Sequence, residues 1–303
     1  MNGILVVDKP AGCKSHDVVQ RVRKALRQRS VGHAGTLDPL ATGVLVVAVG
    51  EGTKLVSHLQ SDDKRYQVTI ALGAETDSHD ADGEVTETAD VPPLDARTVE
   101  QALQPFIGRH PQEAPKLSAI KVGGTPLHRR MRRGEDVEAP VREVDLYEAT
   151  VDEVSQDALR LSLHCGKGFY VRSLARDLAR ALGTLGYVKV LRRTASGAFS
   201  IENGLYGDQM TAEVIAERLI PLKEACAALT RVELTDDGVV HARHGRPIGP
   251  DVVLGDAWRE ASPEESLALF APDGEPVALG RRVDGGIRVV RGFTTSASDV
   301  VSP

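Results

Sequence analysis

The sequence predicts an α+β fold. Apolar residues alternate with polar ones over residues 66–72 and 159–165, which is typical of half-buried strands. Over residues 171–182 the apolar residues recur with helical spacing instead. Because the predicted strands and helices are mixed without a regular βαβ alternation, a doubly wound parallel fold is disfavoured.

The N-terminal half contains four further predicted elements. Residues 4–7 form a short apolar run, which indicates a buried strand. Ser15 can cap a helix whose apolar residues 18–26 share one face. Residues 43–49 form a continuous apolar strand, and residues 95–103 suit a short helix.

The second half divides near Thr230. Before it, residues 166–170 lie at a strand-to-helix junction, and residues 187–191 and 195–200 suggest two more strands. After it, Gly, Pro and short β-like runs predict a small β domain, with runs at residues 252–254, 267–270, 277–279 and 287–290. We therefore expect a domain at residues 1–229, a second at 230–293, and a flexible tail at 294–303.

Composition is that of an ordinary globular protein. The 303 residues are 41% hydrophobic and 26% charged, and no apolar run approaches the roughly 18 residues that a membrane helix needs. The N-terminal apolar stretch is too short for a signal-peptide core. The 3 cysteines lie far apart and form no metal pair or disulfide framework. We therefore expect a cytoplasmic protein that does not associate with membranes.

Charge is unevenly distributed. The formal net charge of -6 argues against nucleic acid when taken alone. Two stretches are nevertheless basic, namely Lys9, Lys14, Arg21, Arg23, Lys24, Arg27 and Arg29, and Lys116, Lys121, Arg129, Arg130, Arg132 and Arg133. Each stretch is either a solvated surface or a phosphate-binding face. An acidic protein can still bind phosphates at a basic face, because the local electrostatic field and not the net charge determines what binds there.

Three segments carry candidate chemistry. Residues 32–43, GHAGTLDPLATG, form a loop that can expose the Asp38 carboxylate, although a tight turn in which Asp38 bonds its own backbone explains the composition equally well. Arg172 follows the 166–170 junction in the first helical turn, where a cation is unfavourable unless an anion is near. Tyr66 follows two cations on a predicted strand, where it is either a binding residue or part of the core.

Other sites are excluded. Residues 77–83 resemble a calcium-binding loop. When Asp82-Gly83 is aligned with the Asp-Gly pair of such a loop, the first ligand position is Ser78 and the last is Ala89. The bidentate Glu that the last position requires is therefore missing. The histidines show no zinc spacing, and there is no nucleophile elbow of a serine hydrolase.

Eight segments occur in a specific order: residues 3–12 (GILVVDKPAG), 15–19 (SHDVV), 32–43, 64–66 (KRY), 76–83, 118–121 (SAIK), 168–172 (GFYVR) and 191–193 (LRR). Together they resemble the TruB family of tRNA pseudouridine synthases. The resemblance implies a mixed, mostly antiparallel sheet flanked by helices, and a small C-terminal β-rich domain of the RNA-binding PUA type. It implies a basic RNA-contacting arm at residues 115–140.

The resemblance also implies roles. Asp38 is expected to be the nucleophile, Arg172 its ion-pair partner, and Tyr66 the aromatic residue over the target base. Tyr170 is expected to line the pocket, Leu191 to form an apolar wall, and His33 to stack in the tRNA. Lys9 and Lys121 are expected among the substrate-binding residues. The implied reaction converts uridine 55 of the tRNA T-loop to pseudouridine after base flipping, without cofactor or metal.

Two alternatives remain at this point. One is a non-catalytic RNA-binding or RNA-folding protein, for which Asp38 is dispensable. The other is a pseudouridine synthase acting on another RNA or depending on a guide RNA and partner proteins. The single-chain layout with a short C-terminal domain favours a tRNA enzyme that acts alone, so no guide RNA is expected. We also expect the protein to be monomeric.

Overall fold

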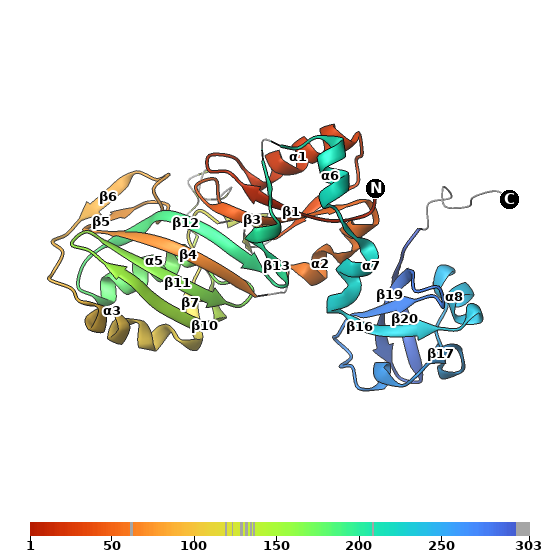
Figure 1. Cartoon of the computed structure of the whole chain (residues 1–303). Helices are drawn as coiled ribbons and strands as arrows, with labels where there is room; N and C mark the ends of the chain where they lie inside the picture. The colour runs from red at the N-terminus through yellow and green to blue at the C-terminus, as the bar shows by residue number, and fades with distance from the viewer. Residues whose placement is uncertain are drawn as a thin grey trace.

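The computed structural model describes residues 1–60, 63–118, 120–122, 124–127, 130, 133, 135, 137–207 and 209–294, with only the backbone of residues 121, 122 and 126. Its main features are two separate sheets with helices packed around them (Figure 1). The α+β class predicted from the sequence is confirmed. Among the described residues, no helix has the length and apolar character needed to cross a membrane.

The large sheet contains 11 strands and runs in the order β14-β1-β3-β12-β4-β11-β10-β7, with β2, β13 and β15 attached at its side. Only the pairs β1–β14 and β3–β12 are parallel. The strands are β1 (Gly3–Lys9), β2 (Val31–Ala34), β3 (Thr42–Val49), β4 (Lys64–Leu72), β7 (Gly108–Glu113), β10 (Val141–Val154), β11 (Ala158–Cys165), β12 (Gly186–Ser196), β13 (Phe199–Ser200), β14 (Leu205–Tyr206) and β15 (Ile220–Pro221).

Helices and hairpins surround this sheet (Figure 1). The helices are α1 (Ser15–Leu26), α2 (Val56–Leu59), α3 (Ala96–Leu103), α5 (Val171–Ala181), α6 (Ala212–Arg218) and α7 (Leu222–Ala225). Two small hairpins are formed by β5 (Ala74–Thr76) with β6 (Val85–Thr88), and by β8 (Lys121–Val122) with β9 (Thr125–Pro126).

Two details differ from the sequence-based expectations. Residues 187–191 and 195–200 were expected as separate strands, but β12 runs through residues 186–196 and only β13 follows as a short hairpin partner. The polar residues between the two apolar runs caused the error. The N-cap of α1 is Lys14 rather than Ser15, whose hydroxyl is used elsewhere.

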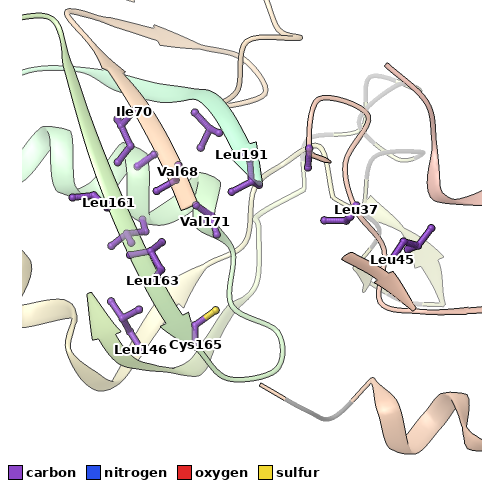
Figure 2. Close-up of a cluster of buried hydrophobic side chains, with 14 of the residues drawn as sticks. Leu37, Leu45, Val68, Ile70, Leu146, Leu161, Leu163, Cys165, Val171 and Leu191 are labelled. Atoms are coloured by element: carbon purple, nitrogen blue, oxygen red, sulfur yellow. The ribbon is translucent and has the colours of Figure 1, made fainter. Parts of the chain in front are cut away.

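The main apolar core lies between the large sheet and its helices. Figure 2 shows part of it, where Val68 and Ile70 of β4 lie beside Leu161 and Leu163 of β11, close to Val171. Residues of β1 and β3 alternate between two cores because successive side chains of a strand point to opposite faces. Leu5, Val7, Leu45, Val47 and Val49 belong to this core, whereas their even-numbered neighbours Ile4, Val6, Val44, Val46 and Ala48 belong to a second one.

The second sheet has five strands in the order β17-β16-β18-β19-β20. They are β16 (Thr230–Leu234), β17 (Val253–Leu254), β18 (Leu267–Phe270), β19 (Pro276–Val283) and β20 (Gly286–Gly292). Helix α8 (Asp236–Arg243), which the sequence reading missed, packs against it. Phe270, Leu279 and Phe293 join Ile4 and Val44 in the second apolar core, so the two sheets share buried surface.

Candidate active site

The segment between β2 and β3 carries Asp38 in a tightly anchored loop. The Ser15 hydroxyl donates to the Leu37 carbonyl oxygen at 3.0 Å and accepts from the Leu37 N–H at 2.8 Å. The Ala41 N–H donates to the Asp38 carbonyl oxygen at 3.1 Å. Gly35 has a φ of +91°, a backbone conformation that a β-carbon would disfavour. The glycine-rich sequence therefore allows the turn, and α1 holds it in place.

Lys9, which is expected among the substrate-binding residues, lies at the end of β1. Its side chain is fully buried. It donates to the carbonyl oxygens of Pro10, Cys13 and Pro39 at 2.9, 2.7 and 3.2 Å. Burial lowers the pKa of Lys9, and Asp38 is among the charges that oppose this shift. Lys9 thus joins the end of β1 to the loop that carries Asp38.

Arg172 lies in the first turn of α5 and reaches the loop across the sheet. Its Nε is 3.0 Å from Oδ2 of Asp38, and its Nη1 is 3.5 Å from Oδ2 of Asp80. Its remaining N–H groups donate to the carbonyl oxygens of Ser78 at 2.9 Å and Leu117 at 3.2 Å. Two carboxylates and two carbonyls therefore offset the cost of a buried cation at a helix N-terminus.

Asp80 is a site residue that sequence reasoning missed. It is buried, its carboxylate also accepts from the Ser78 hydroxyl at 2.5 Å, and it lies between β5 and β6. The acidic residues of segment 77–83 were visible in the sequence, but they were considered only as a calcium loop and as part of one of the eight ordered segments. The structure shows that this segment supplies a second carboxylate to Arg172.

The protonation of Asp38 depends on opposing effects. Burial raises the pKa of the Asp38 carboxyl, Arg172 lowers it, and the nearby Asp80 raises it again. The net pKa lies above the ordinary value, so Arg172 acts in the expected direction but does not outweigh burial. About a third of the side-chain surface, 37%, is still accessible, so a molecule in the pocket can reach the carboxylate.

A cavity of about 530 Å³ opens over Asp38. Tyr66 of β4, Leu191 of β12, and Tyr170 and Phe169 from the junction before α5 line it together with Arg172. Cavities of this size are typical of small-molecule or nucleotide-sized ligands. Burial raises the pKa of the Tyr66 phenol while the Arg193 guanidinium opposes the shift, so the phenol remains protonated and can donate a hydrogen bond.

Tyr170 and Arg193 are fixed by their own partners. The backbone N–H of Tyr170 donates to Oε1 of Gln112 at 2.8 Å, and Nε2 of Gln112 donates to the Tyr170 carbonyl oxygen at 3.1 Å. Arg193 is 1% exposed and donates to the carbonyl oxygens of Val44 at 2.7 Å and Gly35 at 3.2 Å. Arg193 thus ties β12 to the beginning of the Asp38 loop, a role that its place in the sequence did not reveal.

Lys9 and His33 are not among the described residues that line this cavity. His33 lies on β2, and burial lowers the pKa of its imidazole, with Arg193 adding to the effect. Lys121 lies on β8, and its side chain is outside the described part of the structure. The structure therefore brings together Asp38, Tyr66, Tyr170, Arg172 and Leu191, but not Lys9 or His33. Within the described ranges, no three His, Cys, Asp or Glu side chains are grouped to hold a metal ion.

Comparisons with known proteins agree on one group. Residues 23–171 match the family described as TruB family pseudouridylate synthase (N terminal domain). The chain is 40% identical over 285 residues to "tRNA pseudouridine synthase B" of Xanthomonas campestris pv. campestris (strain B100), covering 92% of this chain and 90% of that protein. It is 40% identical over 304 residues to the protein of the same name from Thermobifida fusca (strain YX), covering 97% and 99%.

Solved structures show the same fold at lower identity. A chain from an H/ACA RNP bound to a substrate RNA containing 2'-deoxyuridine aligns with a TM-score of 0.72 at 23% identity, covering 97% of this chain and 85% of that chain. A chain of a Cbf5-Nop10-Gar1 complex aligns with a TM-score of 0.73 at 24% identity, covering 96% and 84%. At this identity the likeness concerns the fold alone.

Proposed function

Because the chain belongs to the TruB family of pseudouridylate synthases, we propose that it isomerises uridine 55 in the T-loop of tRNA to pseudouridine. The observation that carries this proposal is the reachable Asp38 carboxylate, paired with Arg172 at 3.0 Å on the wall of a nucleotide-sized cavity. The relatives with about 40% identity are named tRNA pseudouridine synthase B, which supports tRNA as the substrate and pseudouridine as the product.

The target uridine must leave its stacked position before it can meet Asp38. Base flipping costs a few kcal/mol, which contacts in the pocket offset. The Tyr66 ring and the Leu191 side chain both line the cavity and supply surfaces on which the uracil can stack. The expected stacking of His33 within the remaining RNA remains part of this proposal, and its position outside the cavity is compatible with it.

Asp38 then acts as the nucleophile in its ionised form. A covalent bond to the carboxylate divides one difficult step into two easier ones. The N-glycosidic bond breaks, the uracil turns, its C5 bonds to the ribose carbon, and the bond to the carboxylate breaks so that Asp38 is regenerated. C5 loses a proton and N1 gains one, so the atoms balance and no redox partner is required. Arg172 holds the carboxylate in position and opposes its protonation.

Tritium release tests this reaction directly, because the C5 proton is lost. Wild-type protein with [5-³H]uridine-labelled T-loop RNA should release tritium, and Asp38→Asn should release none while binding the RNA. Asp90→Asn is the matched control, since Asp90 is an exposed carboxylate outside the cavity. Residual turnover by Asp38→Asn above background would exclude the nucleophile assignment.

The same assay separates the alternatives. If RNA binds but neither wild type nor control releases tritium, the non-catalytic RNA-binding function is favoured. Release by the purified chain on unmodified tRNA, with no added RNA or protein, supports a tRNA enzyme that needs no guide RNA. Light scattering of the same sample tests the expected monomer, and we further expect the protein to act in the cytoplasm.

Two other regions complete the proposal. The second sheet, within the expected domain at residues 230–293, is proposed as a PUA-type RNA-binding domain because of its compact five-stranded architecture. The basic arm at residues 115–140 is proposed to contact RNA, with Lys121 among its residues, although several of its residues lie outside the described ranges. The tail expected at residues 294–303 is described only at Thr294, whose N–H donates to Glu51.

A further inference from the structure

Helix α1 and the segment after it carry a dense cluster of positive charge. Within residues 14–29 the only acidic residue is Asp17, whereas six residues are basic: Lys14, Arg21, Arg23, Lys24, Arg27 and Arg29. We call these six residues the α1 basic surface. Arg23 is half-buried and the other five are exposed. Since the whole chain has a net charge of -6, this concentration is local.

The α1 basic surface lacks internal compensation. None of its six residues takes part in an ion pair with any residue that the structure describes. The carboxylate of Asp17 accepts from the backbone N–H of Lys14 at 2.9 Å instead. Other exposed arginines do have carboxylate partners, as Arg160 has Glu153 at 3.0 Å and Arg259 has Asp256 at 2.7 Å.

The helix dipole explains only part of this pattern. Arg23 and Lys24 lie in the last turn of α1, where cations are favourable. Arg27, however, has a φ of +48°, a left-handed conformation in which Gly or Asn is the usual choice. An arginine at this position is strained, which points to a use for its charge.

The surface is also hollowed. One depression of about 490 Å³ is lined by Gln20, Arg23, Lys24, Arg27, Gln28 and Arg29. Another of about 510 Å³ is lined by Arg21, Lys24 and Ala25 of α1 with Gly207 and Met210 opposite. Lys24 borders both, so the two depressions lie on either side of a single exposed lysine.

The cluster is connected to the reaction centre. Ser15 at the start of α1 holds Leu37, the residue before Asp38, through two hydrogen bonds. The 12 residues of α1 extend about 18 Å from that point. The basic residues therefore lie along, or next to the ends of, a helix that begins at the anchor of the Asp38 loop.

We propose that the α1 basic surface binds phosphates of the substrate RNA that flank the nucleotide held at Asp38. This inference rests on the proposed function. Contacts of this kind position the RNA without reading its sequence, and they make its affinity depend on salt. Because they are the same before and during the reaction, they lower KM and leave kcat unchanged.

The test compares two triple variants on an unmodified tRNA transcript by tritium release over a range of salt concentrations. Arg21→Gln/Lys24→Gln/Arg27→Gln removes three charges of the surface. Arg109→Gln/Arg160→Gln/Arg180→Gln removes three exposed charges that have carboxylate partners and lie outside the expected 230–293 domain, so the net charge of the two variants is equal. We expect KM of the first variant to rise at least about tenfold, with its salt slope reduced by roughly 2–3, and the control to resemble wild type.

A single substitution separates binding from folding. Arg27→Gly removes the charge and relieves the left-handed strain at once. We expect its Tm to equal or exceed that of wild type while its KM for tRNA rises, a combination that a purely structural role for Arg27 does not produce.

Several outcomes would overturn the inference. Equal KM values and salt slopes for the two triple variants would make the surface a solvated face. A fall in kcat at unchanged KM would show that the substitutions act through the Ser15 link instead. Absence of tritium release by wild type is a different result, because it contradicts the proposed function itself.

Discussion

At the scale of single residues, the reactivity of Asp38 depends on the guanidinium group beside it. Burial and Asp80 raise the pKa of the Asp38 carboxyl, and Arg172 lowers it. In the proposed reaction the ionised form is the nucleophile, so we expect activity to be lost as the pH falls through this pKa. A change that raises the pKa must therefore move the loss of activity to higher pH.

Arg172→Gln tests this dependence. Removing the cation should raise the pKa of Asp38 further, so activity should fall at least about tenfold at neutral pH and recover partly at alkaline pH. The pH profile of kcat/KM for tritium release measures the shift. Arg180→Gln is a control on the same helix, because Arg180 is exposed and pairs with Glu75 at 2.9 Å. An equal loss of activity at every pH would contradict the proposed effect on Asp38.

The sequence predicted a side-chain partner where a charged residue occupies a locally unfavourable position. A cation in the first turn of a helix predicted an anionic partner, and Arg172 has Asp38 and Asp80. Asp80 itself was missed because its partner Arg172 lies 92 residues away in the chain (172 minus 80), and no local sequence pattern reveals such a pairing. The burial of Lys9 was not foreseen because a lysine is usually exposed, and one of its partners, Pro39, comes from 30 residues away.

At the scale of elements, the close approach of β3 and β12 aligns the Asp38 loop with the cavity. Gly43 pairs with Arg193 across this parallel contact, and Arg193 bonds back to Gly35 and Val44. A β-carbon on Gly43 would lie 2.1 Å from the Arg193 carbonyl oxygen, and Gly43 has a φ of +97°. Glycine at this position is therefore required by both space and backbone conformation.

Gly43→Ala should lower the free energy of unfolding by at least about 2 kcal/mol, because both strain and contact oppose the new methyl group. Gly32→Ala is the matched control, since a β-carbon there meets no atom within 4 Å, and it should change stability by about 0.5 kcal/mol or less. Urea denaturation measures both. A similar change in the free energy of unfolding for both substitutions would show that β3 and β12 can move apart at little cost to accommodate the methyl group.

The sequence predicted well those elements in which one pattern of apolar residues dominates, either a continuous run or helical spacing. The run at residues 267–270 corresponds to β18, and the helical spacing at residues 171–182 corresponds to α5 with a one-residue difference. Helix α8 was missed because its sequence, DDGVVHAR, contains a glycine and two β-branched residues, which have low helix propensity. The Thr235 cap and two aspartates in its first turn compensate.

At the scale of the whole molecule, the shared apolar core makes the two sheets dependent on each other. Phe270 of the second sheet and Ile4 of the first belong to one buried cluster. Lys54, beside the large sheet, also donates to the Gly292 carbonyl oxygen at 2.6 Å. We therefore expect the sheets to unfold together.

Phe270→Ala tests this coupling, because it should cost about 3–5 kcal/mol and lower the denaturation midpoint of both sheets. Trp258 is the only tryptophan and is buried in the core of the second sheet, so its fluorescence reports that sheet, while loss of tritium release reports the first. The two midpoints should coincide in wild type and variant. Phe270→Leu should have a smaller effect, and separate midpoints would show independent units.

The pairing of β1 has a consequence for the synthesis of the protein. β1 bonds to β3 on one edge, but its other edge is completed only by β14 and β15, at residues 205–206 and 220–221. A ribosome must therefore translate as far as residue 205 before β1 can pair with β14, and as far as residue 220 before it can pair with β15. Until then the nascent chain carries an open strand edge, and a chaperone that covers this edge would act on β1.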